Sequence, residues 1–309
     1  MCLSRSLLWY DVASRFASEA VFDTVRFTKM HGLGNDFVVI DAVDDPALAA
    51  LAESAAVRLC DRTRGIGSDG VLIALPSAKA DFEMVMVNPD GTRGMCGNGL
   101  RCFARFLRAN GRATADELTI DTPNGVTTAR LLPSGHPLHG DVEVDMGVAR
   151  LSAAEIPMDP PAPPASGDRI VDYPLQVGGA TYVITCVSMG NPHCVIFVDD
   201  PDVVDLAHVG PLIENHNAFP ERTNVHFCRV VASDELVMRP WERGAGATLA
   251  CGTGACAAAV AGAISGRSGR EADVRMPGGS LRIRWLPEGN VMMKGPAETA
   301  FVGEIELDH

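Results

Sequence analysis

Met95-Cys96-Gly97-Asn98-Gly99 and Ala250-Cys251-Gly252-Thr253-Gly254 follow one pattern, a cysteine before Gly-X-Gly, with the two cysteines 155 positions apart (251 − 96). A period this long far exceeds the ~20–50 residues of repeat proteins, so it indicates duplication of a whole domain. Two such halves, facing each other across a pseudo-twofold axis, would place Cys96 and Cys251 on opposite walls of one cleft. Further segments recur at nearly the same offset: Gly34-Asn35-Asp36 with Gly190-Asn191-Pro192, and Pro123-Asn124-Gly125 with Pro277-Gly278-Gly279.

Composition limits the classes of protein to consider. The 309 residues suit two domains of ordinary size, and a hydrophobic content of 47% is enough for two cores. A net charge of −13 with scattered basic residues argues against nucleic-acid binding. No apolar run approaches the ~20 residues that a membrane span needs. Nine cysteines without a Cys-X-X-Cys pair indicate free thiols in a reducing, cytoplasmic compartment, and neither a disulfide framework nor a metal site.

Each half is predicted to hold several strands and one central helix. Residues 99–109 carry apolar side chains at helical spacing and end at Asn110-Gly111, a common helix stop. Residues 253–264 are almost wholly apolar, so this helix must be buried on all sides. We therefore predict an α+β fold of two pseudo-symmetric domains, each a curled, mostly antiparallel sheet wrapped around a central helix. Further helices are expected over 47–60 and 209–216, and strands over 27–30, 37–41, 71–75, 82–87, 118–121, 126–132, 142–146, 181–187, 194–198, 225–231 and 236–239.

The domain boundaries are predicted from proline and from the limits of the repeat. Five prolines lie between residues 157 and 164, and because proline cannot occupy the interior of a helix or central strand, this stretch is expected to be a linker. The two domains are expected over 26–148 and 149–296. Residues 1–25 have no counterpart in the second half, so we expect a dispensable N-terminal extension.

The two Cys-Gly-X-Gly segments lie at the starts of the two central helices. A helix N-terminus has unpaired N–H groups and about +0.5 of partial charge, so it attracts a carboxylate and is expected to lower the pKa of a thiol from ~8.5 toward ~3.5–7.5. Removing the weakly acidic α-proton of an amino acid requires a strong local base and stabilisation of the developing negative charge. A thiolate on one face and a thiol on the other, each at a helix end, would supply both.

Structural roles are the competing interpretation for each of these residues. A single cysteine before glycine more often serves packing than catalysis, but two duplicated ones favour catalysis. His193 alone would be a satisfied structural histidine, and Glu242 alone a solvated charge. Beside a thiol, both become candidates to orient or assist it.

Five separated motifs, in order, resemble the diaminopimelate epimerase family, and the resemblance covers the chain from Phe27 to about its C-terminus. It implies an isomerase that epimerises LL-2,6-diaminopimelate to the meso form by a two-base mechanism without a cofactor, on a pathway to lysine and peptidoglycan. It also implies that a last strand, about 297–309, returns to the first domain. The motifs are Lys29-Met30-His31-Gly32-Leu33-Gly34-Asn35-Asp36-Phe37, Met95–Gly99, Gly190-Asn191-Pro192-His193, Thr223-Asn224-Val225, and Trp241-Glu242-Arg243-Gly244-Ala245-Gly246 with Ala250–Gly254.

The resemblance also assigns roles to residues. Cys96 and Cys251 would be the acid/base pair, with His193 assisting Cys96 and Glu242 assisting Cys251. The backbone of Gly97, Asn98, Gly252 and Thr253 would hold the reacting carboxylate. The end of the substrate that does not react would be held by Asn35, Asn88, Asn191, Asn224 and Arg243.

Several other functions compete with this one. The nearest is another cofactor-independent racemase or epimerase of the same fold, although Arg243 and the asparagines favour a substrate with a second amino-acid end. An isomerase of the phenazine-biosynthesis type would lack the paired cysteines, and a non-catalytic binding protein would not need them. A thiol redox protein is disfavoured because the sequence has no Cys-X-X-Cys pair, and a pyridoxal enzyme because no lysine lies in a cofactor motif. We expect a small amino-acid substrate, no nucleic-acid or membrane partner, and a homodimer as the candidate assembly.

Overall fold

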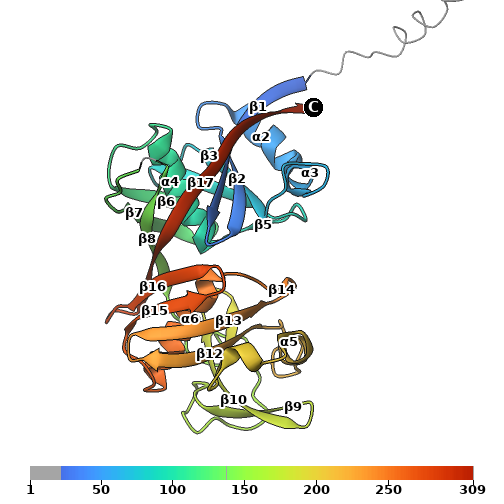
Figure 1. Ribbon diagram of the computed structural model, residues 1–309, viewed down its shortest axis with the longest axis vertical. Helices are drawn as coiled ribbons and strands as arrows, with labels where there is room; N and C mark the ends of the chain where they lie inside the picture. The colour runs from blue at the N-terminus through green and yellow to red at the C-terminus, as the bar shows by residue number, and fades with distance from the viewer. Residues whose placement is uncertain (1–21, 137, 309) are drawn as a thin grey trace, which may run out of the picture.

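The computed structural model describes residues 22–136 and 138–308, and it consists of two bodies stacked along the long axis of the molecule (Figure 1). The first half of the chain (22–148) forms one body around helix α4 (Gly97–Ala109), and the second half forms the other around α6 (Gly252–Ile264). The predicted α+β architecture is confirmed. Among the described residues, no helix combines the length and the apolar character needed to cross a membrane.

The two halves repeat one order of elements. The first half contains β1 (Phe22–Gly32), β2 (Asn35–Asp41), α2 (Pro46–Ser54), α3 (Ala56–Cys60), β3 (Gly70–Leu75), β4 (Phe82–Val87), β5 (Arg93–Gly94), α4, β6 (Glu117–Thr122), β7 (Gly125–Leu131) and β8 (His139–Val148). The second contains β9 (Tyr173–Val177), β10 (Ala180–Ser188), β11 (Pro192–Phe197), η1 (Pro201–Val203), α5 (Leu206–Glu214), β12 (Asn224–Ala232), β13 (Glu235–Glu242), β14 (Gly246–Ala247), α6, β15 (Glu271–Met276), β16 (Gly279–Trp285) and β17 (Asn290–Asp308). The parallel pairs β2–β3 and β4–β6 have counterparts in β11–β12 and β13–β15, whereas the other strand pairs are antiparallel.

Helices α4 and α6 contribute to one apolar core shared by both halves. In α4 the large side chains Leu100, Phe103 and Leu107 are fully buried, as its helical spacing predicts. In α6 nearly every residue is small and buried, so that sheet strands can approach the helix closely. Because both helices are packed along their lengths, their N-termini are held in fixed positions.

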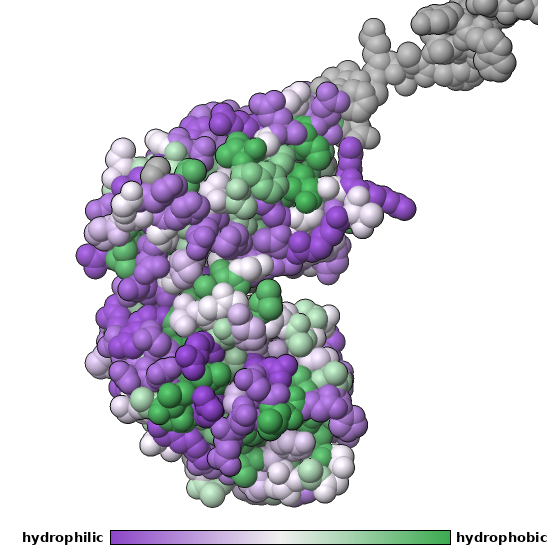
Figure 2. Space-filling model, in the orientation of Figure 1, coloured by the Kyte–Doolittle hydropathy of each residue, from purple (hydrophilic) through white to green (hydrophobic). Residues whose placement is uncertain are grey.

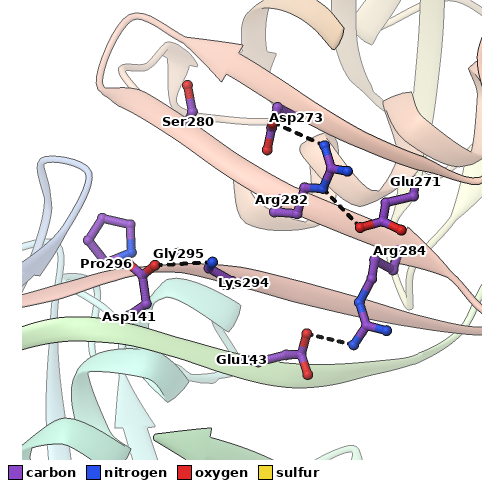
Figure 3. A pocket seen from close by; sticks show the side chains of 10 residues that line it. All are labelled: Asp141, Glu143, Glu271, Asp273, Ser280, Arg282, Arg284, Lys294, Gly295 and Pro296. Carbon is purple, nitrogen blue, oxygen red and sulfur yellow. Dashed lines mark hydrogen bonds and ion pairs between the residues drawn. The ribbon is translucent and has the colours of Figure 1, made fainter. Parts of the chain in front are cut away.

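Strand β17 joins the two bodies (Figure 1). Its first part pairs with β8 of the first half and with β16 of the second, and its second part pairs with β1. The strand begins at Asn290, earlier than the return near 297 that was expected. At this junction Arg284 lies 2.7 Å from Glu143, and Lys294 lies 3.5 Å from Asp141 (Figure 3). The pairing of β8 with β17 and these two ion pairs therefore connect the halves.

The proline-rich stretch 157–164, which is predicted to be a linker, lies outside every described helix and strand but makes contacts with the second half. Ile156 and Met158 are buried in a core of the second half, and the N–H of Asp159 donates to the carbonyl of Ala218. The proline-rich stretch therefore packs onto the second body and is not a free connection. Burial of Ile156 before the prolines and of Met158 between them contributes to holding the stretch there.

Other boundaries also differ from the prediction. Strand β1 begins at Phe22, so part of the expected extension is paired with β17, whereas residues 1–21 lie outside the described residues. The expected helix over 47–60 is divided into α2 and α3 at Ala55. Strands β9, β15 and β16 were not predicted.

Candidate active site

A cavity of about 820 Å³ lies between the two halves, where the space-filling view shows the molecule hollowed (Figure 2). Cys96 and Cys251 both line it, although they belong to different bodies. His193 and Asn224 are the two predicted site residues outside its lining. The predicted residues inside the lining are Asn35, Asn88, Cys96, Gly97, Asn98, Asn191, Glu242, Arg243, Cys251, Gly252 and Thr253.

Cys96 is the N-cap residue of α4, with an extended backbone (φ −142°). Its Sγ lies 3.4 Å from Oδ1 of Asn35. Burial raises the pKa of the Cys96 thiol, and the backbone N–H groups of Gly99 and Asn98 counter this only in part. The thiol is thus presented to the cavity by the start of a buried helix.

Cys251 occupies the same position at the start of α6. Its Sγ accepts a hydrogen bond from the N–H of Gly254 at 3.4 Å. Burial raises the pKa of this thiol well above its ordinary value, and the neighbouring Glu242 carboxylate raises it further. Burial also raises the pKa of Glu242, whose Oε1 accepts a hydrogen bond of 2.5 Å from Thr248.

The prediction that the helix ends lower both thiol pKa values is therefore wrong for this structure. The N–H groups are in place, but burial destabilises the thiolate form of both cysteines more than hydrogen bonds from these N–H groups stabilise it. A thiolate formed in this cavity is consequently a stronger base than one at an exposed helix end.

His193 lies outside the cavity wall and is fully buried in the second half. Its Nε2 is 2.9 Å from Oδ1 of Asn191, and its Nδ1 is 2.9 Å from Nε2 of His226. Because an amide oxygen only accepts, Nε2 of His193 carries the proton and Nδ1 accepts from His226. Within residues 22–136 and 138–308, the hydrogen bonds of His193 thus orient Asn191, and none reaches Cys96.

Asn224 holds the loop that carries Arg243. Its Nδ2 donates to the carbonyl of Pro192 at 2.8 Å, and its Oδ1 accepts from the N–H of Arg243 at 3.0 Å. Both ends of the amide are therefore occupied by backbone. Arg243 itself lines the cavity, and its Nη1 donates to the carbonyl of Glu221.

Sequence reasoning missed two charged residues in the lining, Arg62 and Asp69. Both lie near the glycine-rich segment Gly65-Ile66-Gly67-Ser68-Asp69-Gly70, immediately before the buried strand β3. The sequence signal that could have identified Asp69 is an acidic residue among glycines, directly before a buried strand. Four methionines of the lining, Met86, Met95, Met146 and Met189, add an apolar surface.

Two thiols at helix N-termini, in opposing halves of a duplicated α+β fold, form an arrangement that an isomerase could use to move a proton between two faces of one carbon atom. Solved structures of this fold include a hydroxyproline epimerase from Agrobacterium vitis, with a TM-score of 0.64, 14% identity, and coverage of 93% of this chain and 92% of that one. A PhzF-family phenazine biosynthesis protein from Bacillus anthracis has a TM-score of 0.62 and 16% identity, with coverage of 92% and 99%.

The chain belongs to the diaminopimelate epimerase family, whose model matches residues 27–152 and 185–300. A diaminopimelate epimerase from Moorella thermoacetica is 48% identical over 286 residues, covering 92% of this chain and all of that protein. One from Pelotomaculum thermopropionicum is 50% identical over 282 residues, covering 91% and 98%. The two ranges that the family model matches contain both cysteine motifs of this chain.

Proposed function

We propose that this chain interconverts LL- and meso-2,6-diaminopimelate, with Cys96 and Cys251 as the two acid/base groups. The observation that carries the proposal is that both thiols cap buried helices and line one cavity between the halves. Membership of the family adds the identity of the substrate.

In the proposed reaction one cysteine thiolate takes the α-proton, and the electron pair of the broken C–H bond moves into the adjacent carboxylate as an enediolate. The opposite thiol then gives its proton to the other face of the carbon, so that the charge returns to sulfur. The N–H groups of Gly97, Asn98, Gly252 and Thr253 hold the carboxylate and stabilise the charge that develops on it. The raised thiol pKa values strengthen the base that must remove a weakly acidic proton.

The unreacting end of the substrate would lie against Arg243, Asn88 and Asn191, which line the same cavity, whereas the amide of Asn35 is bonded beside Cys96. A guanidinium is the preferred partner of a carboxylate, and amide oxygens accept from an ammonium group. Glu242 lies beside Cys251 with a pKa raised by burial, and it would take up the proton of that thiol when Cys251 acts as the base.

Deuterium exchange tests this function. In D₂O, without added pyridoxal phosphate or metal, LL-diaminopimelate should gain deuterium at one α-carbon and yield the meso isomer. Exchange into proline or hydroxyproline instead would assign the chain to another racemase of the fold, and no exchange into any amino acid would overturn the proposal.

We further propose that the enzyme acts in the cytoplasm as a homodimer and binds no nucleic acid. Free buried cysteines and the net charge of −13 support the compartment and the lack of affinity for polyanions. Light scattering after size-exclusion chromatography measures the assembly, and a mass of one chain would exclude the dimer.

A further inference from the structure

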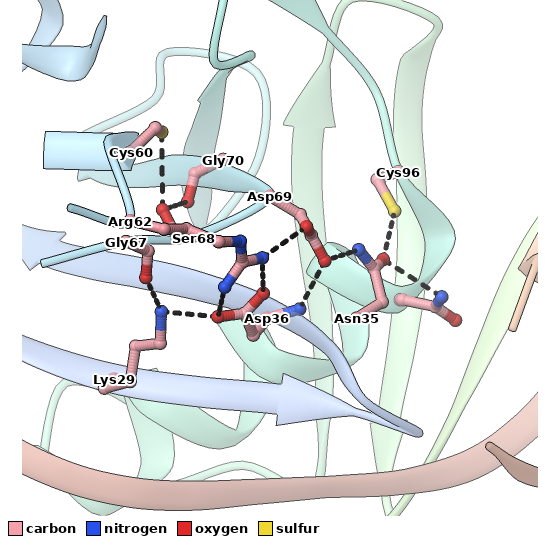
Figure 4. A network of polar contacts seen from close by, with 11 residues as sticks. Lys29, Asn35, Asp36, Cys60, Arg62, Gly67, Ser68, Asp69, Gly70 and Cys96 are labelled. Carbon is pink, nitrogen blue, oxygen red and sulfur yellow. Dashed lines mark hydrogen bonds and ion pairs between the residues drawn. The ribbon is translucent and has the colours of Figure 1, made fainter. Parts of the chain in front are cut away.

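A network of charged and amide side chains forms part of the cavity wall in the first half and extends behind it (Figure 4). Its centre is Arg62, whose Nη2 lies 2.7 Å from Oδ1 of Asp36 and 2.7 Å from Oδ1 of Asp69. Lys29 pairs with Asp36 on the far side. Burial alone would raise the pKa of Asp36, but hydrogen bonds from Arg62 and Lys29 outweigh it and lower that pKa to about 2. The network thus favours the ionised form of Asp36.

Asp69 connects this network to Asn35. Its Oδ2 accepts from Nδ2 of Asn35 at 2.7 Å and from the N–H of Asp36 at 3.0 Å. Arg62 and the backbone N–H of Asp36 can only donate, so both oxygens of Asp69 serve as acceptors. The amide of Asn35 must therefore turn its NH₂ group to Asp69 and its oxygen to the opposite side.

On that opposite side lies Cys96. Oδ1 of Asn35 is 3.4 Å from Sγ of Cys96 and 3.1 Å from Nδ2 of Asn98. Since an amide oxygen cannot donate, the thiol of Cys96 must be the donor, which requires that it hold its proton. The same orientation leaves Oδ1 of the buried Asn98 without a partner among the described residues.

We propose that Asp69 is a positioning residue, which keeps Cys96 as a proton donor by fixing the orientation of the Asn35 amide. The inference deepens the proposed function and rests on it, because it assigns a resting state to one of the two acid/base thiols. The other charged groups that face Cys96 are Glu242, from the opposite half, and Arg101, from α4. Neither contacts Asp69 through a hydrogen bond, so both stay in place when Asp69 is changed.

The test compares Asp69→Ala with Asp69→Asn. Alanine removes the acceptor, so that the Asn35 amide can rotate and offer its NH₂ group to the sulfur, which favours the thiolate. Asparagine removes the same charge but keeps one oxygen that accepts from Asn35. Asp36→Ala is the matched control, since it deletes a carboxylate of the same network that forms no side-chain hydrogen bond with Asn35.

The measurement is the rate of Cys96 alkylation by iodoacetamide as a function of pH, followed on the Cys96 peptide by mass spectrometry, with the Cys251 peptide as internal reference. In Asp69→Ala the pH midpoint for Cys96 should fall by about one unit, which is about tenfold faster alkylation below the midpoint. Asp69→Asn and Asp36→Ala should keep the wild-type midpoint for Cys96. Because the charge of Asp69 raises the pKa of Glu242 beside Cys251, any shift at Cys251 should be the same in Asp69→Ala and Asp69→Asn.

An unchanged midpoint in Asp69→Ala overturns the inference, and so does an equal fall in Asp69→Asn or Asp36→Ala, since charge and not orientation would then be the cause. If Asp69→Ala does not fold, Asp69→Leu removes the acceptor while filling its volume, and it is read in the same way. Alkylation requires no turnover of substrate, so a failure of the proposed function in the exchange assay is distinguished from a failure here.

Discussion

Gly254→Ala should damage the site from behind Cys251. A Cβ at Gly254 would lie 2.5 Å from Cε1 of His226 and 3.0 Å from Sγ of Cys251. His226 is fully buried and bonded to His193 at 2.9 Å, so it cannot give way. The first turn of α6 must therefore shift, and Cys251 shifts with it.

The size of the effect follows from two opposing contributions. Overpacking a tight site costs about 1–3 kcal/mol, and alanine in place of glycine returns up to about 1 kcal/mol in a helix. We expect a net loss of about 1–2 kcal/mol in the free energy of unfolding, which lowers Tm by about 2–3 °C for a chain of this length. A displacement of a reacting group by about 1 Å can cost about 100-fold, so kcat/KM should fall by about that factor.

The first half provides the control. Gly99 occupies the equivalent position in α4, where a Cβ would lie 3.3 Å from Leu72 and 3.6 Å from Cβ of Cys96. Gly99→Ala should therefore change Tm by less than about 1 °C and keep most of its activity. Epimerase assays and thermal unfolding of both variants measure the difference. Equal effects in the two variants, or full activity in Gly254→Ala, would refute the argument from His226.

Three further predictions concern the thiols and the histidines. Cys96→Ser and Cys251→Ser should each abolish nearly all epimerisation without a change in circular dichroism, because a serine hydroxyl is too weak an acid; full activity in either would remove that cysteine from the mechanism. Mild oxidation should inactivate the enzyme reversibly through a Cys96–Cys251 disulfide, since both sulfurs face one cavity, and peptide mapping that finds another linkage would contradict this. Burial lowers the pKa of His226 to about 3 in the folded protein, against about 6.5 in the unfolded chain. The stability that depends on the neutral ring is therefore fully present above about pH 6.5. It is lost as pH falls toward about 3, because over this range only the unfolded chain takes up the proton. Between pH 6 and 4 the free energy of unfolding should therefore decrease by about 1.4 kcal/mol per pH unit for this group, and denaturation of His226→Gln should show a correspondingly smaller slope.

The duplication and the helix starts could be predicted from sequence because they depend on short local patterns. A cysteine before Gly-X-Gly at the head of an apolar run identifies a helix N-terminus without any knowledge of the rest of the chain. The strands β15 and β16 were missed because their outer faces carry charges, such as Arg282 paired with Glu271 and Asp273. These charges break the apolar run that makes a buried strand visible.

The part of the site that escaped prediction depends on strand register. Phe37 lies opposite Gly70 in the parallel pair β2–β3, and this register places Asp69 beside Asp36 and Asn35 although they are more than 30 residues apart in sequence. In the same way, the position of His226 beside His193 follows from the pairing of β11 with β12. The assignment of His193 to Cys96 followed the resemblance alone, whereas the hydrogen bonds lead to Asn191.

The long strand β17 imposes an order on how the protein can be completed during synthesis. Residues 290–308 are the last described segment to be made, yet β1 and β8 of the first body and β16 of the second all pair with them. Until β17 has been made, the edges of β1 and β8 that pair with it remain unpaired. Unpaired strand edges promote aggregation with other chains. The pairing of Phe22 with Asp308 also brings the two ends of the described chain together. A permuted gene that joins these ends and opens a surface turn elsewhere would let β1 and β17 be made consecutively, and would shorten that exposure.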